Sequence, residues 1–222
     1  MKFRFSALAL AFMILVGGAS TASAGPIVLL TFEGLQNLEG IGGFYNGGVG
    51  SLGSVGPNLG VEFVGGSLAI IDADAGGTGN IGGEPSPSTA LFFLDATAVM
   101  NYAAGFDTGF SFYYSAVNSP GYIDVYSGLN KTGLLLAHLD LVVTPSLGGD
   151  PTGAFSPFYA IGVGFAGTAM SIDFGGTANQ IAFDNVTFGS DTPGSVPEPG
   201  STIVLLLSGL AGLKGLASLR RR

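Results

Sequence analysis

Short apolar runs separated by turn residues recur along the middle of this chain. In Gly109–Ser115 and Tyr122–Tyr126 apolar and polar positions alternate, a pattern typical of a strand with one buried face. No internal window longer than a dozen residues has the 3.6-residue period of an amphipathic helix. The expected strands are residues 27–33, 61–64, 67–71, 90–96, 99–103, 109–115, 122–126, 134–143, 158–165, 169–174 and 181–188.

About ten short strands joined by Gly, Pro and Asn turns predict an all-β domain, an antiparallel β-sandwich of jelly-roll type. We place this domain at residues 25–190. Residues 34–60, rich in Gly, Asn and Ser, are expected to form a long loop within it.

The N-terminal apolar run predicts a helical secretory signal peptide. Lys2 and Arg4 precede an apolar core at residues 5–16, and Ala22-Ser23-Ala24 is a small-residue cleavage site. We therefore expect residues 1–24 to be removed between Ala24 and Gly25. The expected partners for this step are the Sec machinery and a signal peptidase.

The C-terminal apolar run is long enough to predict a transmembrane helix within residues 201–222. Thr202–Leu219 would rise about 27 Å as a helix, close to the roughly 30 Å hydrocarbon core of a bilayer. Pro197 and Pro199 disfavour helix in the preceding linker, residues 191–200. The positive-inside rule places the terminal arginines in the cytoplasm.

Three tail elements occur in order: the box Val196-Pro197-Glu198-Pro199, the apolar helix, and the cluster Arg220-Arg221-Arg222. Together they resemble the PEP-CTERM sorting tails of bacterial proteins, although Lys214 interrupts the usual apolar run. The resemblance implies a Gram-negative exported protein that an exosortase-type membrane protease recognises at the box. It also implies transient anchoring in the inner membrane, followed by delivery to the cell envelope or outside the cell. Whether the tail is cut or kept as an anchor stays open.

Charge is distributed very unevenly between the tails and the domain. The whole chain has a formal net charge of −8. Six of its seven basic residues lie in the two terminal segments, whereas 14 of the 15 acids lie between them with Lys131 as the single basic residue. The net charge there is near −13 (1 − 14), so nucleic acid is excluded as a partner. There is no cysteine, and 17 Phe with 7 Tyr argue for a folded core.

Two short motifs at the ends of the domain resemble the first and last strands of lectin-like and carbohydrate-binding jelly rolls. They are Phe32-Glu33-Gly34 and Ile181–Phe188. The resemblance implies that Glu33 and Asp184 lie close together and help to hold a structural Ca²⁺. The alternative is that loop amides satisfy both carboxylates. Residues 72–77 also begin like a calcium loop, but Gly83 stands where the bidentate Glu would be, which favours a solvated turn.

The sequence offers little for catalysis, and we assign no catalytic residue. The one histidine, His138, is expected to face solvent from a strand, and there is no cysteine nucleophile. Residues 162–167 match G-x-G-x-x-G, but a strand rather than a helix follows, so a dinucleotide site is rejected.

We therefore expect a non-catalytic, exported surface or matrix protein associated with a glycan or exopolysaccharide. Ring faces of exposed tyrosines would stack on sugars; the candidates are Tyr45, Tyr113, Tyr114, Tyr122 and Tyr126. One alternative is a secreted polysaccharide hydrolase with paired carboxylates. Another is an ice-binding protein, since such tails also occur there, although no threonine-rich repeat is seen.

Overall fold

The computed structural model describes residues 27–148, 150 and 153–194. Within them every regular element is a β-strand except one 3-10 turn, and all strand pairs are antiparallel. The predicted all-β class is therefore confirmed. The elements are β1 (Val28–Leu30), β2 (Val61–Ile71), β3 (Thr89–Phe106), β4 (Gly109–Ser115), β5 (Gly121–Tyr126), η1 (Leu129–Lys131), β6 (Leu135–Leu141), β7 (Tyr159–Gly164), β8 (Ala169–Gly176) and β9 (Ala182–Phe188).

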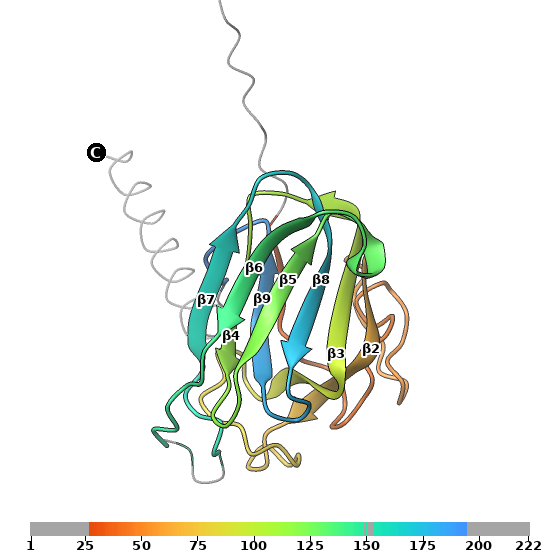
Figure 1. The fold of residues 1–222 in the computed structure, drawn as a ribbon. Coiled ribbons are helices and arrows are strands. Elements are labelled where there is room, and N and C mark those ends of the chain that lie inside the picture. Colours follow the sequence, from red (N-terminus) through yellow and green to blue (C-terminus); the bar gives the residue numbers. More distant parts are fainter. Residues whose placement is uncertain (1–26, 149, 151–152, 195–222) are drawn as a thin grey trace, which may run out of the picture.

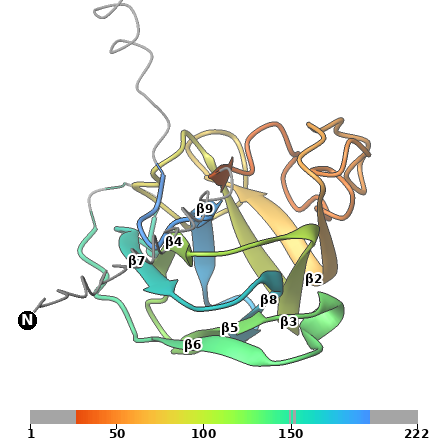
Figure 2. The same ribbon diagram turned by 90° about the horizontal axis from the view of Figure 1, so that it is seen from above.

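The strands form one sheet that folds over into two facing layers (Figures 1 and 2). Its order is β6-β5-β8-β3-β9-β4-β7, with β1 beside β9 and β2 beside β3. The long strand β3 belongs to both layers, because Leu91 pairs with Phe183 of β9 while Val99 pairs with Asp173 of β8. An antiparallel sandwich follows from this arrangement, and the jelly-roll connectivity stays a prediction.

Two predicted strand breaks are wrong, because the chain bends there without leaving the sheet. Residues 61–71 form one strand rather than two, and residues 89–106 form another. The β2–β3 register shifts between Gly65 and Ser67, which marks a bulge. A Cβ on Gly66 would lie 2.7 Å from the backbone nitrogen of Asp95. Glycine there permits close approach of the two strands at the corner.

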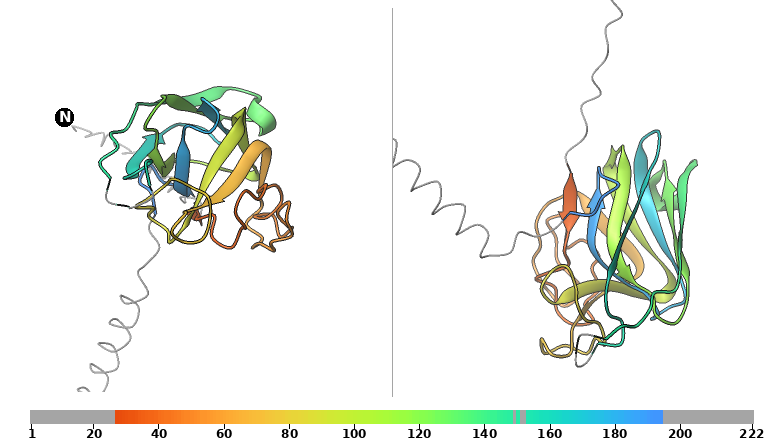
Figure 3. Two further views of the ribbon diagram at one scale, coloured as in Figure 1. Left: turned by 90° about the horizontal axis from the view of Figure 1, so that it is seen from below. Right: turned by 90° about the vertical axis from the view of Figure 1, so that its left-hand side faces the viewer.

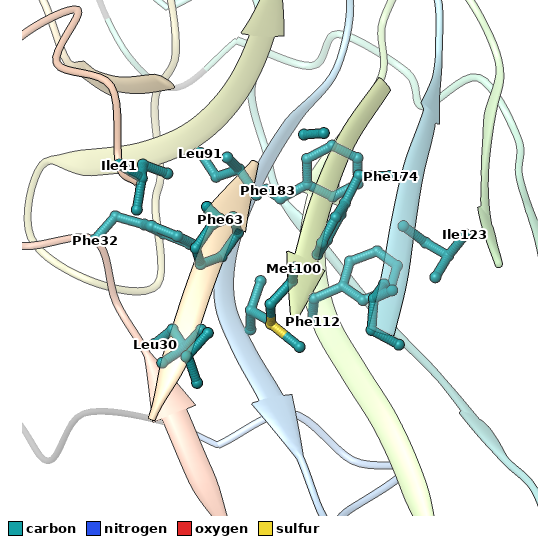
Figure 4. Close-up of a cluster of buried hydrophobic side chains, with 14 of the residues drawn as sticks. Leu30, Phe32, Ile41, Phe63, Leu91, Met100, Phe112, Ile123, Phe174 and Phe183 are labelled. Carbon is teal, nitrogen blue, oxygen red and sulfur yellow. The ribbon is translucent and has the colours of Figure 1, made fainter. Parts of the chain in front are cut away.

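Phenylalanine rings from both layers fill the space between them (Figure 4). The ring of Phe174 on β8 lies 5.9 Å from Phe110 and 6.5 Å from Phe112, both on β4, and 5.1 Å from Phe183 on β9. All four side chains are fully buried. Burying one such ring contributes about 1.5–3 kcal/mol, so this cluster joins the two layers.

The two ends of the described chain lie side by side. Strand β1 pairs with β9, with Leu29 opposite Thr187 (Figure 3). The first and last strands of the described chain are therefore neighbours in the sheet. The predicted terminal helices, residues 1–24 and 201–222, lie outside the described residues. In the part of the chain that the structure describes, no helix has the length and apolar character needed to cross a bilayer.

Candidate functional site

Polar side chains on the outer face of β3 and β8 hold the turn η1 against the sheet. The amide of Asn101 donates to Asn130 Oδ1 over 2.8 Å, and the Asn130 N–H donates to Asn101 Oδ1 over 2.8 Å. Ser171 Oγ accepts the Lys131 N–H over 3.0 Å, and its hydroxyl donates to the Gly128 carbonyl over 2.6 Å. Asn101 and Ser171 are both buried. These four bonds fix η1 as a wall standing on the sheet.

An ion pair adds to this attachment. The Lys131 ammonium lies 3.2 Å from Asp173 Oδ2, and Asp173 is buried. Burial raises the pKa of Asp173 above its usual value, although the bond to Lys131 acts in the opposite direction. The other carboxylate oxygen, Oδ1, is buried and accepts no hydrogen bond from the described residues. Lys131 is therefore already engaged, and its charge is largely compensated.

A groove of about 580 Å³ lies between η1 and the end of the loop 34–60. Its volume falls within the range usual for small-molecule sites. Strands β2 and β3 form its floor, η1 forms one wall and the loop forms the other. The lining residues are Asn46, Leu59, Gly60, Glu62, Val64, Asn101, Tyr102, Ala103, Ala104, Leu129 and Asn130.

The chemistry of this groove suits a polyhydroxylated ligand. The side chains of Asn46 and Asn130 are exposed. Asn46 offers a donor and an acceptor, whereas Asn130 Oδ1 already accepts from Asn101 and its NH₂ group is the donor left for a ligand. Val64, Ala103 and Ala104 supply small apolar surfaces against which C–H groups can pack. Glu62 is exposed and is the one ionisable carboxylate in the lining. The groove can therefore bind hydroxyl groups by hydrogen bonds while it shields the apolar faces of a ring.

Five tyrosines were predicted to be exposed and to stack on sugars. This prediction is wrong for Tyr45 and Tyr114, which lie in the core. Tyr45 and Tyr114 are 4% and 3% exposed. The Tyr45 hydroxyl accepts the Phe32 N–H over 2.6 Å, and the Tyr114 hydroxyl donates to the Val142 carbonyl over 3.2 Å. Because their rings pack among core side chains, they present no face to a sugar. Tyr113 is half-buried against a second, smaller apolar cluster, which consists of Ile81, Ala90, Phe155, Phe158 and Ala182.

Tyr122 and Tyr126 lie half-buried on the outer face of β5 and remain candidates. The Tyr122 ring lies against the backbone of β8, since a Cβ on Gly175 would be 2.1 Å from Tyr122 Cζ. It also stacks on His138 with ring centroids 5.9 Å apart. The Tyr126 hydroxyl donates to Asp124 Oδ2 over 3.3 Å. The turn η1 is bonded to β8, which lies between β5 and β3. Tyr122 and Tyr126 therefore lie on one side of η1 and the groove lies on the other.

His138 faces solvent from β6, as predicted, but two carboxylates contact it. Its Nδ1 lies 2.5 Å from Asp124 Oδ1 and its Nε2 lies 3.2 Å from Asp140 Oδ1. Hydrogen bonds to Asp124 and then Asp140 raise the pKa of His138 above its usual value. The ring is therefore more readily protonated than a free histidine, and when it is protonated its charge lies between two carboxylates.

Glu33 and Asp184 both bind the segment that leads into β3. Glu33 Oε1 accepts the N–H groups of Ser88 (3.1 Å) and Thr89 (2.8 Å). Asp184 Oδ2 accepts the Ser86 N–H over 2.9 Å, and the Ser86 hydroxyl lies 2.8 and 2.7 Å from the two carboxylate oxygens. Burial raises the pKa of Asp184 to about 7, and the charge of Glu33 adds to the effect. Amide and hydroxyl donors thus occupy both carboxylates, and calcium at this pair stays a prediction.

The acidic turn at residues 72–77 is less solvated than the sequence indicated. Asp150 joins it from far along the chain, and carboxylate oxygens of Asp72, Asp74 and Asp150 lie within 4.8 Å of one another. Burial, the bond with Asp74 and the charge of Asp150 raise the pKa of Asp72 to about 6, and burial chiefly raises that of Glu84 to about 7. Grouped acids of this kind are common without a cation, so we assign no metal site here.

The glycine motif at 162–167 is followed by a strand, as the sequence analysis expected, and one of its glycines has a structural role. Gly162 and Gly164 lie in β7, and the strand β8 follows. A Cβ on Gly162 would lie 2.1 Å from the Asp191 carbonyl oxygen. Close backbone approach therefore explains this glycine.

The predicted processing residues lie outside the described residues. They are Ala22, Ala24 and Gly25 at the signal cleavage site, and Val196, Pro197, Glu198, Pro199, Arg220, Arg221 and Arg222 in the tail. The described chain ends at Gly194, which is bonded to β9: its N–H donates to Thr187 Oγ1 over 2.9 Å, and its carbonyl accepts from Asn185 over 3.2 Å. The sheet thus holds the chain only three positions before Pro197.

Sequence reasoning did not single out the groove residues Asn46, Glu62, Asn101 and Asn130. A signal was present for two of them. Asn101 is a lone amide in the apolar run Ala98–Ala104, and Glu62 is a lone charge between Val61 and Phe63. Such exceptions mark polar positions on an outer strand face, and of these two Asn101 has a specific partner, Asn130. Asn46 and Asn130 lie in turns where asparagine is common, so the sequence carries no comparable signal for them.

No family model matches the chain, and no curated protein matches it. A similar solved structure is described as "Binding sub-site dissection of a family 6 carbohydrate-binding module by X-ray crystallography and isothermal titration calorimetry". The two chains are 18% identical, the alignment covers 49% of this chain and 79% of the other, and the TM-score is 0.33. So distant a likeness assigns neither a fold family nor a function to this chain.

Proposed function

We propose that this chain is an exported, non-catalytic protein of the cell surface or extracellular matrix that binds a glycan. The groove between η1 and the loop 34–60 carries the proposal, because it combines exposed amides with small apolar surfaces in a volume of about 580 Å³. Export is supported by the N-terminal signal pattern and by the resemblance of the tail to PEP-CTERM sorting signals. Its expected partners are the Sec machinery, a signal peptidase, an exosortase-type protease and an exopolysaccharide.

The outer face offers room for more than one sugar unit. The groove lies on the β2–β3 side of η1, while Tyr122 and Tyr126 lie on the β5 side. A polymer that crosses η1 would meet amides on one side and aromatic rings on the other. Contacts spread along a chain suit a polysaccharide better than a compact small molecule.

The proposal is tested by measuring retention of the purified protein on a glycan array and on insoluble polysaccharides. We expect binding to weaken about 2- to 12-fold in Asn46→Ala, since it removes a hydrogen-bonding amide worth about 0.5–1.5 kcal/mol. Asn118→Ala is the matched control, because Asn118 is an exposed asparagine outside the groove. Failure to retain any glycan, or equal loss in the control, would overturn the proposal.

A further inference from the structure

The ionic character of the groove narrows the class of glycan that fits it. We infer that the preferred ligand carries free amino groups, as a partly or fully de-N-acetylated hexosamine polymer does. This inference rests on the proposed function and adds to it the chemical class of the sugar. It depends on three observations: the position of Glu62, the engagement of Lys131, and the charge of the domain.

Glu62 is held at the groove by the geometry of β2. Its neighbours Val61 and Phe63 are buried, so strand alternation turns the Glu62 side chain to the outer face. There it lies opposite Asn101, whose amide bonds to η1. Glu62 is exposed, and no hydrogen bond or ion pair engages its carboxylate among the described residues. The groove thus presents one uncompensated negative charge to a ligand.

No cation in the described residues balances that charge. Lys131 is the single lysine or arginine there, and its ammonium is paired with Asp173 at 3.2 Å. His138 lies between Asp124 and Asp140 on another part of the outer face. A sugar acid or a sulfated sugar would therefore enter a groove with a carboxylate and no available positive partner. Repulsion disfavours such ligands.

An ammonium group on the sugar would be attracted by Glu62, whereas an anionic group is repelled. A protonated amino sugar keeps the hydroxyl groups that Asn46 and Asn130 can bind and adds a charge that Glu62 attracts. An exposed ion pair contributes only about 0.2–1 kcal/mol, which corresponds to about a 1.5- to 5-fold change in affinity. The surrounding acidic domain adds a longer-range attraction, which is screened by salt. Amino sugars are therefore distinguished from neutral sugars by a modest, salt-sensitive preference.

The test compares binding of the purified protein to a glucosamine hexamer and to its N-acetylated counterpart by titration calorimetry. The titrations are run at mildly acidic pH, where the amino groups are protonated, and at low and moderate salt. We expect the glucosamine hexamer to bind about 5-fold more tightly at low salt, and the preference to shrink as salt is added. Glu62→Gln should reduce the preference about 3-fold. Asp95→Asn is the matched control, because Asp95 is an exposed acid at the β3 corner outside the groove.

The outcomes separate the inference from the function on which it rests. Equal binding of the two hexamers, or tighter binding of an anionic oligosaccharide, would overturn the inference and leave glycan binding intact. A preference that Asp95→Asn reduces as much as Glu62→Gln would show a general field effect and remove Glu62 from its assigned role. If neither hexamer nor any arrayed glycan binds, the proposed function itself fails.

Discussion

Two acids, Glu39 and Asp184, are completely buried in this protein, and their surroundings shift their pKa values in opposite directions. Glu39 belongs to the loop 34–60, whereas Asp184 lies in the last strand, β9. Both are buried without an ion pair among the described residues. The two regions thus show two ways of placing a carboxyl group away from water.

Glu39 collects donors from its own loop. Its oxygens accept the N–H groups of Gln36 (2.7 Å), Leu52 (2.9 Å) and Ser54 (3.0 Å), and the Ser54 hydroxyl at 2.5 Å. Burial alone would raise the pKa of Glu39, but these bonds outweigh it and lower the value. The approach is close, since a Cβ on Gly50 would be 2.3 Å from Glu39 Oε1. The ionised carboxylate therefore organises the loop that forms one wall of the groove.

Asp184 also accepts hydrogen bonds, from Ser86 and from the Asn185 N–H at 2.6 Å, yet the balance differs. Burial between packed strands dominates, and the negative charge of Glu33 adds to it, so the pKa rises to about 7. The two acids lack exposed area but differ in depth: Glu39 lies under a thin loop, whereas Asp184 lies deep between packed strands. At the shallow site four donors outweigh desolvation, and at the deep site desolvation outweighs the donors.

The largest expected effect that tests this comparison is the loss of stability in Glu39→Gln. The substituted amide carries donors into a site where four donors already converge. We expect the free energy of unfolding to fall by about 2–4 kcal/mol, since bonds to a charged acceptor contribute about 1.5–3 kcal/mol each. The melting temperature, followed by circular dichroism, should drop by several degrees. Glu62→Gln, the same change at an exposed strand position, should leave it almost unchanged, and equal shifts would contradict the role given to Glu39.

A second prediction concerns the pH dependence of stability. Because the folded pKa of Asp184 lies near 7, above its usual value of 3.8, its contribution is complete below pH 3.8 and is lost as pH rises through 7. Glu39 has a lowered pKa, so its contribution is present above its usual value of 4.5 and is lost as pH falls through the lower folded value. We therefore expect maximal stability in mildly acidic solution, measured as the melting temperature from pH 3 to 8.

Two variants test which acid causes the loss of stability on each side of the pH optimum. Asp184→Asn should flatten the decline between about pH 4 and 7, although Asp72 and Glu84, whose pKa values are also raised, should keep part of it. Glu39→Gln should weaken the loss of stability on the acidic side. A melting temperature that rises steadily from pH 4 to 8 in the unchanged protein would contradict the assignment for Asp184.

The smallest expected effect is that of calcium on Glu33 and Asp184. Since amide and hydroxyl groups of the segment 86–89 already donate to both carboxylates, we expect EDTA to lower the melting temperature by no more than a few degrees. Added Ca²⁺ should restore that loss, and Mg²⁺ should not. A large, calcium-specific drop would show that a cation, and not the segment 86–89, compensates these acids. No response to either treatment would reject calcium at this pair.

The alternation of apolar and polar positions was sufficient to predict most strands, because it reports directly which face of a strand is buried. It failed at Gly65–Gly66 and between Ala96 and Val99, where chain breaks were predicted and the structure has a bulge and a bend within continuous strands. It also could not separate Tyr45 and Tyr114 from Tyr122 and Tyr126, because the burial of a tyrosine depends on which layer covers it. The groove could not be predicted either, because it too depends on how the layers and loops come together. Its residues, from Asn46 to Asn130, meet only once β3 has joined the layers and Asn101 has bound η1.

The pairing of β1 with β9 has a consequence for the order of folding. Leu29 finds its partner Thr187 only when almost the whole domain is available, and contacts so distant along the chain slow folding, since a large loop must close before they form. Until β9 has been synthesised, β1 and β4 lack the strand that pairs with both of them. The nascent chain therefore cannot complete the sheet. If the protein is exported as proposed, this delay would help to keep the chain unfolded until it has crossed the membrane, and synthesis of β9 would set the time of folding.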